Sequence, residues 1–144
     1  MIKRAEPADA ELLAALAVCL WEDDDRNSLE AEFRTLTGRE DAACFLKYDG
    51  DTPAAFAQCQ LRRDYVEGTD SSPVGYLEGI YVVPAYRKRG YAAELLSACE
   101  AWAKQQGCRE FASDCELENG ESLRFHLAMG FREANRVICF TKEL

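Results

Sequence analysis

Three cations and a glycine stand together in the middle of the chain, at Arg87, Lys88, Arg89 and Gly90. They follow a stretch rich in β-branched and aromatic residues and precede a run whose apolar residues recur at helical spacing. Such a loop delivers backbone N–H groups to a helix N-terminus, and its glycine lets an anion approach the backbone closely. The spacing therefore predicts a phosphate-binding loop, although an ordinary basic surface turn would explain the same residues.

Two carboxylates are candidates for contact with a cationic ligand. Glu78 interrupts an otherwise apolar strand, where a carboxylate must be paired, hydrogen-bonded or functional. A structural ion pair would account for it equally well. Asp114 ends a strand, where loops and ligands meet, and its alternative is an ordinary turn or cap aspartate. Together the two residues could bind cationic groups and accept a proton.

Two aromatic residues and the single histidine complete this candidate set. Trp21 closes an apolar helix, which favours core packing, but it directly precedes the acidic run 22–25 and could form the wall of a ligand site. The acidic run itself is also explained by a solvated turn. Tyr65 could line a substrate site or cover an interface. His126 could donate a proton near neutral pH, whereas a lone helical histidine is more often structural.

The totals place this chain among globular proteins of one domain, residues 1–144, with 48% hydrophobic and 30% charged residues. A net charge of −9 argues against nucleic acid as a partner and suits a cationic ligand. The longest apolar run, 12–21, is too short to span a bilayer and is flanked by acidic residues, so we expect a cytoplasmic protein without a membrane segment. Seven cysteines without a Cys-x-x-Cys pair predict buried thiols in a reducing compartment, with neither a disulfide framework nor a metal site.

Periodicity and turn residues predict a mixed sheet with helices on both faces, which is an α/β fold. We expect helices over residues 7–21, 27–36 with a capping box from Asn27 to Glu30, about 91–106 with Gly107 closing it, and 119–129. The expected strands cover residues 1–4, 42–48, 54–61, 76–83, 109–114, 131–134 and 137–141.

The order of these elements and the loop motif resemble the GNAT-type N-acetyltransferases, which use acetyl-CoA. The residues that carry this resemblance are Arg87-x-x-Gly90-x-Ala92, Asn119 and Met129-Gly130-Phe131. Further segments look like the chromosomal-type aminoglycoside 6′-N-acetyltransferases, over essentially the whole chain: Leu20-Trp21 and residues 64–68, 71–74, 77–80 and 112–114.

The resemblance implies a GNAT fold, a mostly antiparallel sheet flanked by helices, and it assigns roles to individual residues. The acetyl-CoA arm would lie along Ile80, Tyr81 and Val82, and the cofactor would also contact Asn119. The loop that would hold its pyrophosphate comprises Arg87, Lys88, Arg89, Gly90, Tyr91 and Ala92. The aminoglycoside would be lined by Trp21, Tyr65, Glu78, Asp114 and the position of Asn135, where relatives tend to carry an acidic residue.

These expectations combine into one hypothesis, the transfer of acetyl from acetyl-CoA to the 6′-amine of an aminoglycoside by direct attack, without a metal or an acyl-cysteine. A strand amide between Ile80 and Val82 would polarise the oxyanion. His126 occupies the place where many GNAT enzymes keep a tyrosine that protonates the departing thiolate. The resemblance also implies a homodimer. Two rivals remain open: acetylation of another amine, such as a polyamine or a peptide N-terminus, and a non-catalytic protein that binds acetyl-CoA or the drug.

Overall fold

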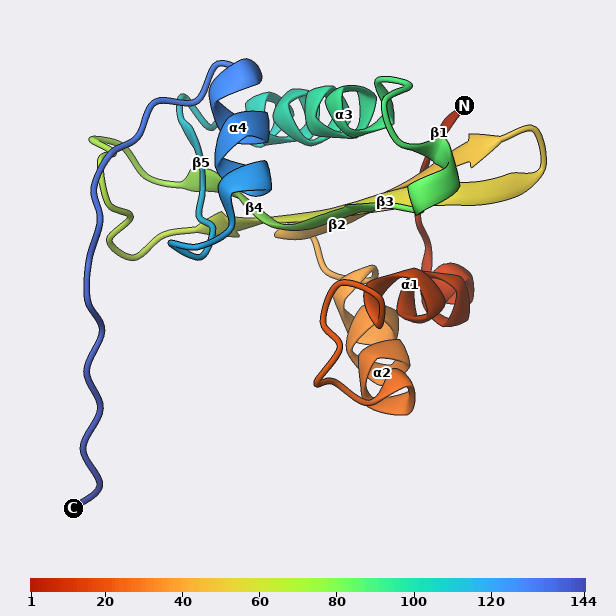
Figure 1. The fold of residues 1–144 in the computed structure, drawn as a ribbon, viewed down its shortest axis with the longest axis horizontal. Helices are drawn as coiled ribbons and strands as arrows, with labels where there is room; N and C mark the ends of the chain where they lie inside the picture. Colours follow the sequence, from red (N-terminus) through yellow and green to blue (C-terminus); the bar gives the residue numbers. More distant parts are fainter.

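A five-stranded sheet runs through the centre of the computed structural model, which describes all of residues 1–144 (Figure 1). The strands lie in chain order, and each pairs antiparallel with the next except the last two, which are parallel. They are β1 (Ile2–Arg4), β2 (Ala42–Asp49), β3 (Thr52–Arg62), β4 (Val74–Val82) and β5 (Phe111–Ser113). The predicted mixed, mostly antiparallel sheet is confirmed.

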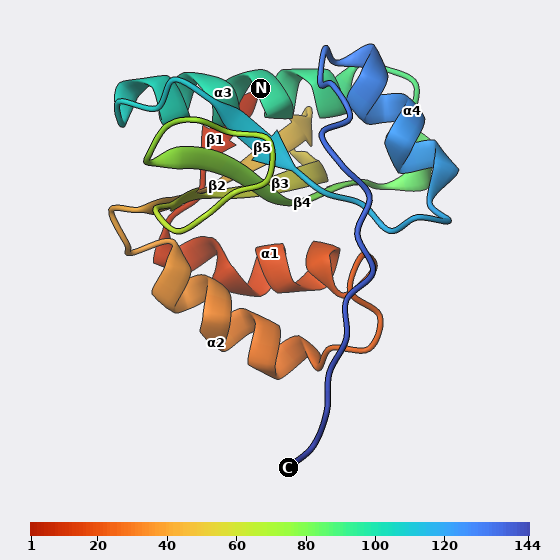
Figure 2. The ribbon, with the colours of Figure 1, turned by 90° about the vertical axis from the view of Figure 1, so that its left-hand side faces the viewer.

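Helices cover both faces of the sheet, as the two perpendicular views show (Figures 1 and 2). Helices α1 and α2 lie on one face, and α3 and α4 lie on the other. Their bounds are α1 (Ala10–Ala17), α2 (Arg26–Leu36), α3 (Tyr91–Gln105) and α4 (Gly120–Ala128), with short 3-10 turns at η1 (Pro7–Asp9) and η2 (Pro84–Tyr86). The α/β fold class is therefore confirmed.

Each face of the sheet has its own hydrophobic core. The buried residues of α3 recur at positions that share one side of a helix, and they pack on β2, β3 and β4: Leu95, Leu96, Cys99, Trp102 and Ala103. On the other face, Phe33 of α2 and Phe56 of β3 meet edge to face, with ring centroids 6.0 Å apart. These two cores fix the helices on the sheet and so position the segments between them.

The first two helices differ from the sequence prediction at their ends. A continuous helix over residues 7–21 is wrong, because α1 ends at Ala17 and the chain continues in turns. The cap of α2 is Asp25, whose carboxylate accepts a hydrogen bond from the Ser28 amide at 3.0 Å. Aspartate and asparagine cap helices equally well. The helix is capped by Asp25, the aspartate that ends the acidic loop, and so it begins before the capping box expected at Asn27.

The last two predicted strands are not formed within the chain. After Phe131, which packs beside Phe111 at 6.3 Å between ring centroids, residues 132–144 extend away from the body without regular secondary structure (Figures 1 and 2). Strands need hydrogen-bonded neighbours, and nothing in the same chain supplies one here. We call residues 132–144 the C-terminal arm.

The cysteines divide into two groups. The four buried thiols are Cys44, Cys59, Cys99 and Cys108, whereas Cys19, Cys115 and Cys139 are exposed. The expectation of seven buried thiols is wrong for the last three, because they lie in loops and in the arm, outside both cores. All seven thiols are free. Each helix is too short or too polar to span a bilayer.

Candidate active site

The basic loop leads from the end of β4 into the N-terminus of α3. Its backbone turns through two left-handed residues, Lys88 at φ 63° and Gly90 at φ 82°. None of the backbone amides from Lys88 to Ala92 donates a hydrogen bond to another group of the chain. Consecutive unpaired amides at a helix N-terminus are a ready anion site. The loop predicted for phosphate therefore has the donors that this role needs.

The cations of the loop are held by neighbouring groups. Arg87 donates through Nε to the Val82 carbonyl at 2.9 Å, and its guanidinium lies 5.7 Å from the centre of the Tyr81 ring. Arg89 lies over the ring of Tyr86 and 3.7 Å from an Asp49 oxygen at the tip of the β2–β3 hairpin. Because these side chains stay half-exposed or exposed at one end of α3, they can meet an anion bound at the loop.

The strand β4 has a free edge beside this loop. It pairs with β5 only from Gly75 to Leu77, and beyond that point no strand covers this edge up to Val82. Apart from the Val82 carbonyl, which accepts from Arg87, the backbone groups of residues 78–82 that point to this edge have no strand partner and are available to a ligand that lies along the strand. The predicted contacts at Ile80, Tyr81 and Val82 fall on this segment.

A β-bulge places Glu78 at the start of the free edge. Gln58 pairs with Gly79 and Cys59 pairs with Leu77, which leaves Glu78 as the extra residue. Bulges redirect side chains and recur next to active sites. The carboxylate of Glu78 accepts two hydrogen bonds from Arg62, from Nε at 3.0 Å and from Nη2 at 2.9 Å.

Asp114 is connected to the same group of side chains through Tyr76. The Tyr76 hydroxyl donates to Asp114 Oδ2, and the Arg62 guanidinium lies 3.4 Å from the centre of the Tyr76 ring. Burial, together with the Asp114 hydrogen bond, raises the pKa of Tyr76 well above that of a free phenol. Tyr76 is therefore a hydrogen-bond donor at any working pH. We call Arg62, Tyr76, Glu78 and Asp114 the acceptor network.

Trp21 lies at the border between core and cavity. Its ring packs against Phe33 and Phe56, with centroids 6.5 and 6.1 Å away, and it crosses the face of Gly79, directly beside Glu78. Trp21 also lines an acidic cavity of about 400 Å³, together with Leu20, Glu22, Asp23, Asp24 and Glu116. The prediction that Trp21 packs in the core is confirmed, whereas its role as the wall of a ligand site stays a prediction.

His126 is held between two serines. Its Nδ1 lies 2.7 Å from the Ser122 carbonyl, and its Nε2 lies 2.8 Å from Ser113 Oγ. A carbonyl can only accept, so in the neutral ring Nδ1 carries the proton and Nε2 accepts from the Ser113 hydroxyl. Ser113 is the last residue of β5 that pairs with β4. The imidazole therefore reaches the point where the two strands part.

The remaining predicted residues lie around this centre. Asn119 caps α4, accepting from the Ser122 amide at 3.0 Å through Oδ1. Tyr65 is 82% exposed and donates to Glu67, which also accepts from Asn135 Nδ2 at 2.9 Å. Neither Tyr65 nor Asn135 forms a hydrogen bond with the acceptor network. The structure brings together Trp21, Glu78, Asp114 and His126, and it leaves these two at the base of the arm.

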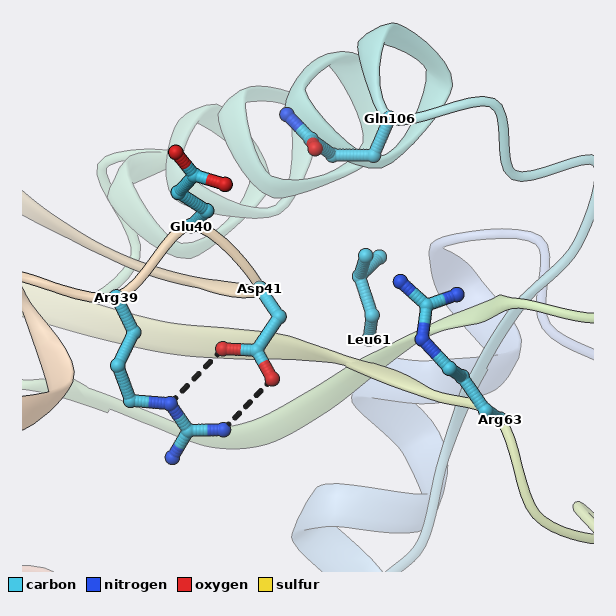
Figure 3. A pocket seen from close by; sticks show the side chains of 6 residues that line it. All are labelled: Arg39, Glu40, Asp41, Leu61, Arg63 and Gln106. Carbon is cyan, nitrogen blue, oxygen red and sulfur yellow. Dashed lines mark hydrogen bonds and ion pairs between the residues drawn. The ribbon is translucent and has the colours of Figure 1, made fainter.

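A second polar cavity, of about 420 Å³, lies away from all predicted residues (Figure 3). It is lined by Arg39, Glu40, Asp41, Leu61, Arg63 and Gln106, and the Arg39 guanidinium pairs with Asp41 through two hydrogen bonds of 2.8 and 2.7 Å. Gln106 caps the C-terminal end of α3, opposite the basic loop. No group of His, Cys, Asp and Glu side chains is placed to hold a metal ion.

Four residues of the site were absent from the sequence prediction: Arg62, Tyr76, Ser113 and Glu116. Arg62 had one available signal, since a carboxylate inside an apolar strand demands a partner and Arg62 ends the neighbouring strand. Ser113 lies in segment 112–114, which carries the family resemblance, but that resemblance assigns it no role. Tyr76 and Glu116 carry no signal in the sequence, because their roles depend on which strand lies beside which.

The family model described as "Acetyltransferase (GNAT) family" matches residues 10–131. The chain belongs to this GNAT family. The family resemblance inferred from the loop motif is therefore confirmed. The matched residues include the free edge of β4 and the adjoining basic loop.

Among GNAT proteins, this chain is similar to two curated enzymes over almost its whole length. It is 44% identical to aminoglycoside N(6′)-acetyltransferase type 1 of Stenotrophomonas maltophilia, covering 99% of this chain and 93% of that protein. It is 40% identical to the protein of the same name from Acinetobacter haemolyticus, covering 99% and 98%.

Solved structures give the same picture. AAC(6′)-Iy in complex with the bisubstrate analog CoA-S-monomethyl-acetylneamine superposes with a TM-score of 0.95 at 36% identity, covering 100% of this chain and 98% of that one. AAC(6′)-Ih from Acinetobacter baumannii gives a TM-score of 0.92 at 38% identity, with the same coverage.

Proposed function

We propose that this GNAT protein is an aminoglycoside 6′-N-acetyltransferase that moves acetyl from acetyl-CoA to the 6′-amine of the drug by direct attack. One observation carries the proposal: a single strand, β4, has an anion loop at one end of its free edge and a carboxylate beside an acidic cavity at the other. The similarity to named aminoglycoside N(6′)-acetyltransferases and to a bisubstrate complex supports the pairing of these two substrates.

The anion end fits acetyl-CoA. The unpaired amides from Lys88 to Ala92 would bind the pyrophosphate, with Arg87 and Arg89 beside them. The free edge from Ile80 to Val82 would hold the pantetheine arm through backbone hydrogen bonds, and one of its amides would polarise the thioester oxygen. The acetyl group supplied there is the electrophile of the reaction.

The acidic end fits a polycationic amine. Glu78 and Asp114 would hold the ammonium groups and take up the proton that the attacking amine releases, directly or through water. Trp21 would offer its ring face to the sugar, and the acidic cavity residues would attract the charged drug. Direct attack needs no cysteine, and the four buried thiols lie in the helix–sheet cores.

His126 and Ser113 would complete the proton balance. The departing thiolate requires a proton, and the Ser113 hydroxyl lies at the end of the β4–β5 pairing with His126 directly behind it. When the ring carries protons on both nitrogens, Nε2 could give its proton to the Ser113 oxygen while the Ser113 hydroxyl gives its own to the sulfur, which leaves the neutral ring with its proton on Nδ1.

The proposed activity is tested by incubating the purified chain with acetyl-CoA and an aminoglycoside that carries a 6′-amine. The expected result is release of free CoA and a product whose acetylated nitrogen, located by NMR, is N6′. Glu78→Gln and Asp114→Asn should lower kcat/KM while acetyl-CoA binding persists, since a positioned base contributes about 10²–10⁴-fold. Turnover of polyamines or peptides in place of every aminoglycoside would refute the substrate, and binding without CoA release would refute the enzyme.

We further propose that the enzyme is a cytoplasmic single-domain homodimer. Seven free cysteines suit a reducing compartment. The arm leaves apolar side chains in water, with Ile138 81% and Phe140 87% exposed, and its strand-like sequence needs a neighbour that the same chain does not offer. A second copy would supply that edge. Light scattering should give a dimer for the full chain and a monomer for a chain ended at Arg132; a monomeric full chain would contradict this proposal.

A further inference from the structure

A cation of the chain itself occupies the Glu78 carboxylate. Arg62, the last residue of β3, donates one hydrogen bond to each Glu78 oxygen, at 3.0 and 2.9 Å. Its guanidinium also lies over the Tyr76 ring at 3.4 Å, and the Tyr76 hydroxyl donates to Asp114. One side chain thus connects, through one aromatic ring, both carboxylates proposed to receive the amine.

The positive charge of the Arg62 guanidinium opposes the binding of a polycation at Glu78. Arg62 must therefore favour the reaction in another way if the site is to work. An arginine held by a fork of two hydrogen bonds and by stacking has few ways to move, and it fixes the carboxylate plane that it grips. Each Glu78 oxygen keeps a second lone pair. Glu78 can therefore stay paired with Arg62 and still accept a hydrogen from an ammonium group that enters from the side of Trp21.

We propose that Arg62 is a positioning residue for acetyl transfer: it aims Glu78 at the acceptor amine and, by cancelling one of the two negative charges, limits how tightly the cationic product is held. This inference rests on the proposed function, because it assigns the Glu78 side of the site to the amine. Arg62 touches no reacting atom and acts through Glu78.

Steady-state kinetics of Arg62→Met and Arg62→Lys test the two parts of this role. Met keeps an apolar stem but has no charge and no hydrogen-bond donors. The Glu78 carboxylate would then lose its fixed orientation, and kcat should fall about 10- to 100-fold. The drug KM should fall by about threefold at low salt, since a repelling unit charge has gone from the site. Lys restores the charge but not the fork, and so should return KM to the wild-type value while kcat stays low.

A double-mutant cycle with Glu78→Gln separates positioning from general structural support. If Arg62 acts through Glu78, Arg62→Met should change kcat less than about threefold in the Glu78→Gln background. Each kcat is expressed per acetyl-CoA-binding site, so a loss of folded protein does not count. Arg63→Met is the matched control, because Arg63 is the adjacent arginine and lines the cavity of Figure 3 instead, and it should match wild type.

Three outcomes would overturn the inference: kcat of Arg62→Met within threefold of wild type, an equal loss in the Glu78→Gln background, or a rise in the drug KM. Arg62→Lys retains the charge and most of the stem, so it gives the kcat part of the answer even if the Met variant fails to fold. The wild-type enzyme is assayed first on the aminoglycoside and on other amines. Failure on the drug alone refutes the proposed substrate, and the cycle is then run with the amine that is acetylated.

Discussion

Gly79→Ala should push Trp21 into the proposed drug cavity. A Cβ built on Gly79 would lie 2.6 Å from Trp21 Cζ2 and 2.8 Å from Cη2, whereas ordinary contacts begin near 3.4 Å. The ring must therefore withdraw by 3.4 − 2.6, or about 0.8 Å. Phe33 and Phe56 hold its other sides, which leaves the acidic cavity as the open direction.

The expected cost follows from this displacement. Overpacking of a filled core costs typically about 1–3 kcal/mol, which for a chain of this size lowers Tm by roughly 2–10 °C. Misplacement by about 1 Å at a site can cost about 100-fold, so kcat/KM for the aminoglycoside should fall by about 10- to 100-fold. The KM for acetyl-CoA should change much less, because the loop proposed to bind its pyrophosphate lies at the other end of β4.

The assay compares thermal unfolding and two-substrate kinetics for three variants. Gly38→Ala is the matched control, since its nearest neighbour atom would lie at an ordinary 3.5 Å, and it should resemble wild type. Adding Trp21→Leu to Gly79→Ala replaces the ring with a smaller side chain and should recover stability without recovering drug affinity. An unchanged Tm together with an unchanged drug KM in Gly79→Ala would refute the reasoning.

Three further outcomes can be measured directly. Tyr76→Phe removes the donor to Asp114, and the loss of a hydrogen bond to a charged group, about 1.5–3 kcal/mol, should lower kcat/KM for the drug by about 10- to 100-fold without changing acetyl-CoA binding; equal kinetics would contradict the network. The hydrogen bonds from the Ser71 hydroxyl and the Asp70 amide lower the pKa of Glu110. The ionised Glu110 carboxylate therefore stabilises the fold above the pKa of an ordinary glutamate, about 4.3. This stabilisation is lost as the pH falls through the lower pKa that Glu110 has in the folded protein. Glu110→Gln should speed hydrogen exchange of the Asp70 amide at pH 7, with the difference from wild type vanishing in acid; no difference at pH 7 would count against the contact. A thiol reagent should react quickly with three cysteines and with all seven only after unfolding, the fast group being Cys19, Cys115 and Cys139.

Local chemistry made part of this architecture predictable. The sequence predicted that Gly107 closes the third helix, and Gly107 has the left-handed φ of 89° that such a position requires. It predicted a helix start at Asn119, which caps α4. Each of these features depends on a few consecutive residues, and so does the basic loop. The residue types and the backbone conformation that they favour lie on the same short segment. Such features can therefore be predicted from the sequence without knowledge of the fold.

The centre of the site depended on pairing between distant strands. Glu78 is a bulge residue only because Gln58 pairs with Gly79 and Cys59 with Leu77, and no pattern along one strand specifies a shift of one residue. The partner of Glu78, Arg62, lies 16 positions away. The two strands predicted for the C-terminal arm are wrong for a related reason. The sequence of the arm favours a strand but does not specify which sheet edge that strand would pair with.

The distribution of charge separates two substrates of opposite sign. Glu78 and Val82 are four residues apart along β4, or about 13 Å at 3.3 Å per residue, and the cations of the loop lie beyond Val82. The Debye length at physiological salt is about 8 Å, so the acidic cavity and the basic loop are screened from each other. Arg62 also neutralises the charge of Glu78, which is the carboxylate nearest to the proposed thioester site. Acetyl-CoA and drug should consequently bind in either order with little change in each other's affinity, and raising the salt concentration should weaken both, which calorimetric titration of each substrate with and without the other can measure.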